Sequence, residues 1–179
     1  MGSINIFDEK FLNPLSKVSL DDNDTSLFID LIDDKYIDFD KKVVRYIYSI
    51  IKKGYKDFIS CVDTVIKVDD KLFLIEFKNS PRSNIKKYSI LAKAIESLTI
   101  IQRYYDTKNI ELNFITIYND NKNQSYKKVG RAMKNIDNFP LEFGLAKYKN
   151  IVFDNIYTMD KKDFLYFKES EFIFAKNWE

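Results

Sequence analysis

The chain has 179 residues, 45% of them hydrophobic and 16% aromatic, which is enough to bury the core of one folded domain. Its formal net charge is only +2 at pH 7, so any basic surface that binds nucleic acid must be local. A single cysteine, Cys61, excludes an intrachain disulfide, and the absence of histidine excludes Ser-His-Asp catalysis, HNH-type nuclease chemistry and histidine-ligated zinc.

Neither a targeting segment nor a membrane span is recognisable. Residues 1–10 lack the basic start and apolar run of a signal peptide. No apolar stretch approaches the roughly 20 residues that a spanning helix needs. The sequence predicts a cytoplasmic protein, formed by residues 1–179 as one domain.

A helix is predicted over residues 41–53. Asp38 or Asp40 can cap its start, and Gly54 can end it. The helical spacing is carried by apolar residues at Phe39, Val43, Val44, Ile47, Ile50 and Ile51. Residues 55–60 are predicted to form a short strand after this helix.

The most informative stretch is a predicted hairpin between Ser60 and Asn79. Apolar and β-branched residues alternate from Val62 to Val68, and the next run is apolar on both faces until Glu76 and Lys78. Such a strand is typical of the buried centre of a sheet. With Asp69-Asp70 as a two-residue turn, Val68 pairs with Lys71 and Asp63 falls opposite Glu76.

This register brings charged side chains together on one face. Residues that pair directly share a face, with Cβ atoms about 4.5–5.5 Å apart, and Lys78 shares the face of Glu76. Facing carboxylates repel each other, and buried charges without partners are costly. A divalent cation between Asp63 and Glu76 removes both objections, and Mg²⁺ commonly uses one or two carboxylates. The alternative is an ordinary Glu-Lys pair on a half-exposed hairpin.

The pattern resembles the PD-(D/E)XK nuclease superfamily, the restriction-endonuclease-like fold. Asp63 matches the first acid of its motif and Glu76-Phe77-Lys78 the second part, whereas Val62 replaces the usual proline. The resemblance covers about residues 40–119 and implies an α/β fold with an αβββαβ core, a central mixed sheet flanked by helices.

The resemblance also implies roles for these residues. Asp63 and Glu76, with the backbone carbonyl of Phe77, would hold Mg²⁺ or Mn²⁺, and Lys78 would orient water or neutralise developing charge. Many members carry another acid on the helix before the sheet, but residues 41–53 contain none. Four aspartates are substitutes among which the sequence does not choose: Asp30, Asp38, Asp40 and Asp57.

A long helix is predicted over residues 83–105, following Pro81. Its apolar stripe is drawn through Leu91, Ala94, Ile95, Leu98, Ile101 and Tyr105. One turn before Leu91, Lys87 is a candidate phosphate contact, since the resembled family often places a polar residue there; the alternative is that it extends into solvent. Lys86 and Lys93 are expected on another, solvated face.

The remaining segments complete the predicted sheet and a binding surface. Residues 110–118 form a strand, and two aromatic-rich segments after residue 149 form strands, or a strand and a helix, that complete the sheet or an interface. A helix over residues 124–136 carries Lys127, Arg131 and Lys134, a basic face suited to backbone phosphates. A solvated charged face is the alternative.

The predicted function is Mg²⁺-dependent hydrolysis of nucleic acid, DNA more than RNA, by an endonuclease. The competing prediction is an inactive module of the same fold that binds nucleic acid or a protein. The sequence leaves open whether the chain forms a homodimer or a larger complex.

Overall fold

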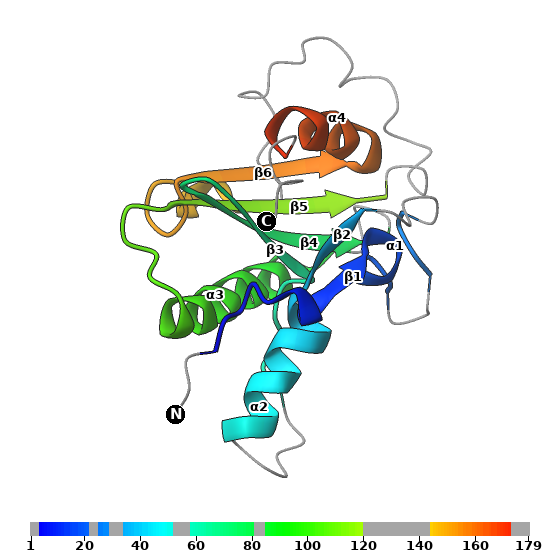
Figure 1. Ribbon diagram of the computed structural model, residues 1–179. Helices are drawn as coiled ribbons and strands as arrows, with labels where there is room; N and C mark the ends of the chain where they lie inside the picture. The colour runs from blue at the N-terminus through cyan, green and yellow to red at the C-terminus, as the bar shows by residue number, and fades with distance from the viewer. Residues whose placement is uncertain are drawn as a thin grey trace, which may run out of the picture.

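One mixed sheet of six strands runs through the structure, a computed structural model that describes residues 4–21, 25–28, 34–51, 58–80, 85–119 and 144–172 (Figure 1). The strands lie in sequence order, with the first four antiparallel and the last three parallel. They are β1 (Leu12–Pro14), β2 (Lys35–Asp38), β3 (Thr64–Val68), β4 (Lys71–Lys78), β5 (Glu111–Tyr118) and β6 (Asn155–Asp160). Strand β4 therefore belongs to both the antiparallel and the parallel part.

The β3–β4 hairpin has the predicted register. Val68 pairs with Lys71, and Thr64 pairs with Ile75 at the far end of the ladder. Asp69 turns the chain in the left-handed region (φ 49°), which Asp tolerates better than most residues. The interior residues of β4 are all buried, so the prediction of a central strand is confirmed.

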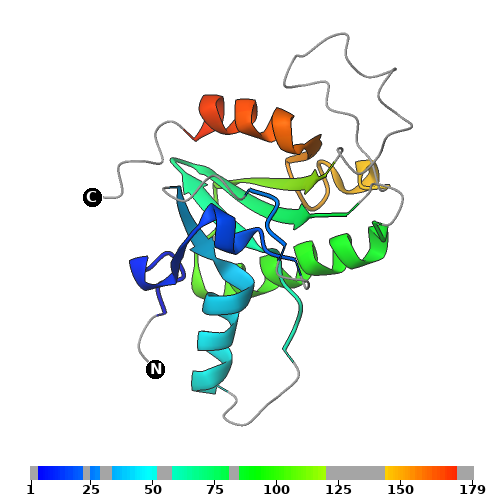
Figure 2. The same cartoon turned by 90° about the vertical axis from the view of Figure 1, so that its right-hand side faces the viewer.

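Helices cover both faces of the sheet, as Figures 1 and 2 show for α3 (Lys87–Tyr104) and α4 (Lys161–Glu171). On one face, α3 packs with α2 (Arg45–Ile51) and the π-helical turn η2 (Phe39–Val44) around Leu72 and Leu74. On the other face, α4 and α1 (Leu15–Val18) pack around Phe73, Ile75 and Phe77. Two short 3-10 helices, η1 (Glu9–Phe11) and η6 (Ala146–Tyr148), complete the described elements.

The α/β class and the mixed sheet flanked by helices are confirmed, but the predicted order of elements is wrong in one place. Residues 58–60 form no strand, whereas β2 pairs with β3 and precedes the helix. The predicted αβββαβ core has a helix followed by three strands. In the structure β2 comes before the helix, and β3 and β4 come after it. Residues 55–57 lie outside the described residues.

Of the two alternatives predicted for the C-terminal segments, strands or a strand and a helix, the structure has the second, as β6 and α4. β6 pairs in parallel with β5 and completes the sheet at that edge. Across the described ranges, no helix has both the length and the apolar composition needed to cross a bilayer.

Candidate active site

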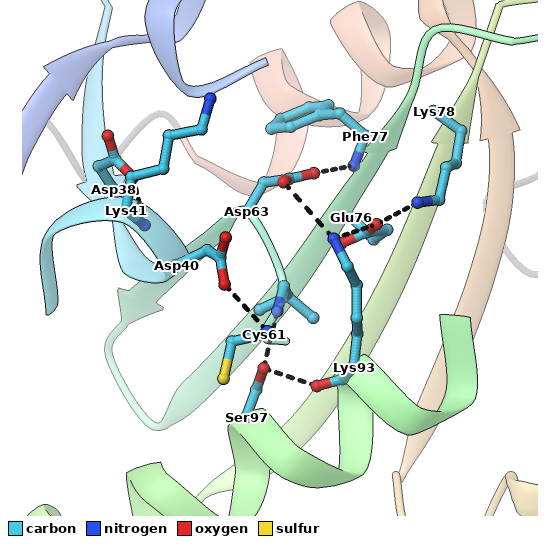
Figure 3. Close-up of polar contacts among 11 residues, drawn as sticks. Asp38, Asp40, Lys41, Cys61, Asp63, Glu76, Phe77, Lys78, Lys93 and Ser97 are labelled. Atoms are coloured by element: carbon cyan, nitrogen blue, oxygen red, sulfur yellow. Dashed lines mark hydrogen bonds and ion pairs between the residues drawn. The ribbon is translucent and has the colours of Figure 1, made fainter. Parts of the chain in front are cut away.

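The segment just before Asp63 is held by hydrogen bonds to helix side chains and not by pairing with a neighbouring strand. The Cys61 N–H donates to Oδ1 of Asp40 at 3.0 Å, and the Val62 N–H donates to Oγ of Ser97 at 2.8 Å. These bonds to η2 and α3 take the place of the hydrogen bonds that the Cys61 and Val62 N–H groups would make to a neighbouring strand. Asp63 thus enters β3 from a segment anchored on two helices (Figure 3).

Asp63, the residue before β3, lies next to Glu76 of β4. The last ladder pair, Thr64 with Ile75, leaves Asp63 across from Glu76. Oδ2 of Asp63 accepts the Phe77 N–H at 2.7 Å, which fixes the carboxylate against β4. The predicted register is confirmed here. The role predicted for the Phe77 carbonyl stays a prediction, and its side chain packs on the opposite face with Phe28 and Phe164.

Glu76 is a fully buried carboxylate, and its ion pairs within the described residues involve one oxygen, Oε1. Its Oε1 lies 2.5 Å from Nζ of Lys78, whose side chain is 24% exposed. Among the described residues, neither Oε2 of Glu76 nor the hydroxyl of Thr116, its neighbour on β5, has a hydrogen-bond partner. Adjacent buried polar atoms without protein partners are typical of places that take up water or an ion.

Lys93 is the site residue that the sequence interpretation missed. Predicted to be solvated, it is instead 17% exposed, with Nζ 2.9 Å from Oε1 of Glu76 and 4.0 Å from Oδ1 of Asp63. The prediction was wrong because the helix stripe was drawn through Leu91 and Ile95, whereas Ile90 and Ser97 are buried and Ile95 is exposed. Lys93 lies three residues after Ile90 and four before Ser97, on the same face, and that spacing was the available signal.

Burial and neighbouring charges change the ionisation of this cluster. Burial and the adjacent Glu76 carboxylate raise the pKa of Asp63, although Lys93 and the Phe77 N–H oppose the change. Burial alone would lower the pKa of Lys93, but the carboxylates of Glu76 and Asp63 outweigh it and raise that pKa. The ammonium of Lys93 is therefore the charged form that the site stabilises.

Asp40 is the aspartate upstream of β3 that lies beside this cluster. It is in the first turn of η2, and Figure 3 shows its carboxylate near Asp63 while one oxygen accepts the Cys61 N–H. Asp38 instead caps η2, accepting the Lys41 N–H at 3.1 Å and the Asn13 amide at 2.7 Å. Of the four aspartates predicted as substitutes, Asp30 and Asp57 lie outside the described residues.

The donor atoms are compatible with a cation such as Mg²⁺ at the Asp63–Glu76 pair. No group of three or more His, Cys, Asp and Glu side chains in the described ranges is arranged to hold a metal ion. Mg²⁺ does not need such a group, because it commonly takes one or two carboxylates and keeps several waters. Oε2 of Glu76, for which the described part of the chain offers no hydrogen-bond partner, is an oxygen ligand of the right kind.

The predicted nucleic-acid contacts are not part of the described site. Lys127, Arg131 and Lys134 lie outside the described residues. Lys87 is the first residue of α3, and its side chain is outside the described part of the structure. The structure thus brings together Asp63, Glu76 and Lys78 of the predicted residues, places Asp40, one of the four candidate aspartates, beside them, and adds Lys93.

No protein-family model, curated protein or solved structure matches this chain.

Proposed function

We propose that the protein is a metal-dependent nuclease that hydrolyses phosphodiester bonds, in DNA more than in RNA, on a restriction-endonuclease-like fold. The observation that carries the proposal is the pairing of Asp63 with a fully buried Glu76, with Lys78 two residues later at the end of β4. A carboxylate without any exposed surface is costly to keep unless it has a function or full pairing.

Each residue of the cluster has a role in this chemistry. Asp63 and Glu76 would hold Mg²⁺ or Mn²⁺, which supplies a water of lowered pKa and stabilises charge on the phosphate. Lys78 holds a positive charge beside Glu76, where it can neutralise charge that develops on the phosphate oxygens. The Phe77 N–H keeps Asp63 oriented toward Glu76. Asp40 is the residue that we assign to the role of the upstream helix acid.

The place of the site in the sheet supports a binding function. Lys78 is the last residue of β4, which runs parallel to β5 and β6. In open α/β sheets, ligands bind beyond the carboxyl ends of parallel strands. The order of the β3–β4 hairpin, the helix α3 and the parallel strand β5 also accords with the restriction-endonuclease-like fold. The position of β2 before α2 departs from the expected order.

A second candidate is an inactive module of the same fold that binds nucleic acid or a protein. One observation favours it: Lys78 and Lys93 both lie within ion-pair distance of Oε1 of Glu76, so the site's own cations offset its carboxylates. A cluster of this kind can persist as a structural network without turnover.

A cleavage assay separates the two candidates. Labelled single- and double-stranded DNA and RNA are incubated with the protein in Mg²⁺, Mn²⁺ or EDTA. The nuclease proposal expects cleavage of at least one substrate, most strongly DNA, that depends on the metal and stops in EDTA. Binding of these substrates without cleavage under any metal condition would favour the inactive module.

A further inference from the structure

One ammonium group bridges both predicted metal ligands. Nζ of Lys93 lies 2.9 Å from Oε1 of Glu76 and 4.0 Å from Oδ1 of Asp63. The same oxygen of Glu76 also contacts Lys78 at 2.5 Å. Two carboxylates and two ammonium groups therefore balance each other within the cluster, and the partly buried Asp40 adds one negative charge nearby.

The backbone of α3 holds Lys93 at this position. Oγ of Ser97 donates to the backbone carbonyl of Lys93 at 2.7 Å and also accepts the Val62 N–H. Ile90 and Ala94, on the same helix face, are completely buried against the sheet. Because these contacts fix the backbone of Lys93, the ammonium can leave the carboxylates only by rotation about the bonds of its flexible side chain.

A divalent cation that enters between Asp63 and Glu76 meets this ammonium as a like charge. The cation and Lys93 need the negative charge of the same two carboxylates, and like charges repel strongly where water is largely excluded. If Lys93 stays, the cluster acquires an excess of positive charge. A phosphate anion removes that excess, because it offers the displaced ammonium oxygen atoms to bind.

We propose that Lys93 is a resident counter-ion that competes with the divalent metal for Asp63 and Glu76, and that turns to the phosphate group when metal and phosphate bind together. This inference rests on the proposed metal-dependent function and adds a regulation of it. Because coupling between two ligands is reciprocal, phosphate tightens metal binding and metal tightens phosphate binding by the same factor.

The first test measures Mn²⁺ binding to the folded protein by the electron paramagnetic resonance signal of free Mn²⁺, without nucleic acid. The Lys93→Met variant keeps the length of the side chain and removes its charge. It should bind Mn²⁺ about tenfold more tightly than the wild type, within the usual range of coupling factors. The matched control is Lys162→Met, which removes an exposed charge from α4 on the opposite face and should leave the affinity unchanged.

The second test needs no variant, so it stands even if Lys93→Met does not fold. Mn²⁺ affinity of the wild type is measured with and without dimethyl phosphate, a phosphodiester anion, at ionic strength matched with sodium chloride. Dimethyl phosphate should tighten Mn²⁺ binding about tenfold. In the folded Lys93→Met variant the same addition should have little effect.

The outcomes distinguish this inference from the proposed function. Equal Mn²⁺ affinity in the wild type and Lys93→Met, or no effect of dimethyl phosphate on the wild type, would overturn the competition while leaving a metal site. Mn²⁺ binding that Glu76→Gln does not weaken would place the metal elsewhere and overturn both ideas. Absence of Mn²⁺ binding in wild type and Lys93→Met, with unchanged circular dichroism, would also overturn both.

Discussion

The charged side chains of the candidate site are one another's ion-pair partners. Glu76 is fully buried, where a charge needs close partners, and both Lys93 and Lys78 lie within ion-pair distance of its Oε1. Asp63 lies near the ammonium of Lys93 and accepts a hydrogen bond from the Phe77 N–H. Removing one member leaves another charge without its partner, so single substitutions should cost more than paired ones.

Stability of the Glu76–Lys93 pair can be measured with a double-mutant cycle. Glu76→Gln and Lys93→Met should each lower the free energy of unfolding by roughly 1–3 kcal/mol, because each removes one partner of a largely buried charged group. The double variant should cost at least about 1 kcal/mol less than the sum of the two. Urea denaturation gives all four values. Strict additivity would mean that the two side chains do not interact.

Lys78 separates metal binding from chemistry. Lys78→Ala should abolish cleavage, since the positive charge at the end of β4 would be removed, yet it should not weaken Mn²⁺ binding, because an ammonium is not a metal ligand. Cleavage rates at saturating substrate and Mn²⁺ titration measure the two effects, with Lys162→Ala as the control for the removal of an exposed charge. Cleavage at the wild-type rate by Lys78→Ala would mean that the Glu-Phe-Lys match is a coincidence.

At the level of elements, α3 builds the site as much as the hairpin does. It contributes Lys93 directly, and through Ser97 it holds Val62, the residue before Asp63. The hydroxyl of Ser97 has two partners, the Val62 N–H and the Lys93 carbonyl. The helix therefore fixes the backbone of Lys93 relative to the segment that leads to Asp63.

Ser97→Ala tests this link. The substitution leaves the Val62 N–H buried without an acceptor, which should cost about 1–3 kcal/mol of unfolding free energy. Thr99→Ala is a matched control, because Thr99 is exposed and donates to the carbonyl four residues earlier in the same helix; it should change stability by less than about 0.5 kcal/mol. Equal effects in urea denaturation would show that Ser97 does not anchor the hairpin.

The hairpin could be predicted from the sequence because neighbouring residues determine its structure. The period of two, the Asp69-Asp70 turn and the position of Asp63 opposite Glu76 all follow from neighbouring residues. Two features depend on contacts between distant segments and could not be predicted in the same way. The phase of α3 is set by packing of Ile90 and Ser97 against the sheet, and Ser60–Val62 is held by helix side chains and not by a strand.

For the whole molecule, the site lies where the antiparallel and parallel halves of the sheet share β4. The carboxyl ends of β4, β5 and β6 lie at the same end of the sheet, which is the end where ligands bind in such sheets. A nucleic acid that reaches Lys78 there would also need partners for its neighbouring phosphates. The prediction that Lys127, Arg131 and Lys134 supply them concerns residues outside the described ranges.

Salt dependence tests the predicted basic segment. Replacing Lys127, Arg131 and Lys134 together with glutamine should weaken duplex DNA binding and lower the slope of log K against log salt by roughly 0.9 for each phosphate that the variant no longer neutralises. The single-turnover rate at saturating substrate should stay unchanged, because these residues are predicted to act in binding alone. An unchanged salt slope would show that this segment is only a solvated face.

The central claim is that the Asp63–Glu76 pair performs metal-dependent phosphodiester hydrolysis. Single-turnover cleavage of DNA in Mg²⁺ by the wild type, Glu76→Gln and Glu169→Gln tests it most directly, since Glu169 is an exposed carboxylate on α4, on the opposite face of the sheet. The account predicts that Glu76→Gln cleaves about a thousandfold more slowly or worse, on the scale of removing a main electrostatic contribution, and that Glu169→Gln cleaves at the wild-type rate. Cleavage by a folded Glu76→Gln protein at the wild-type rate would contradict it.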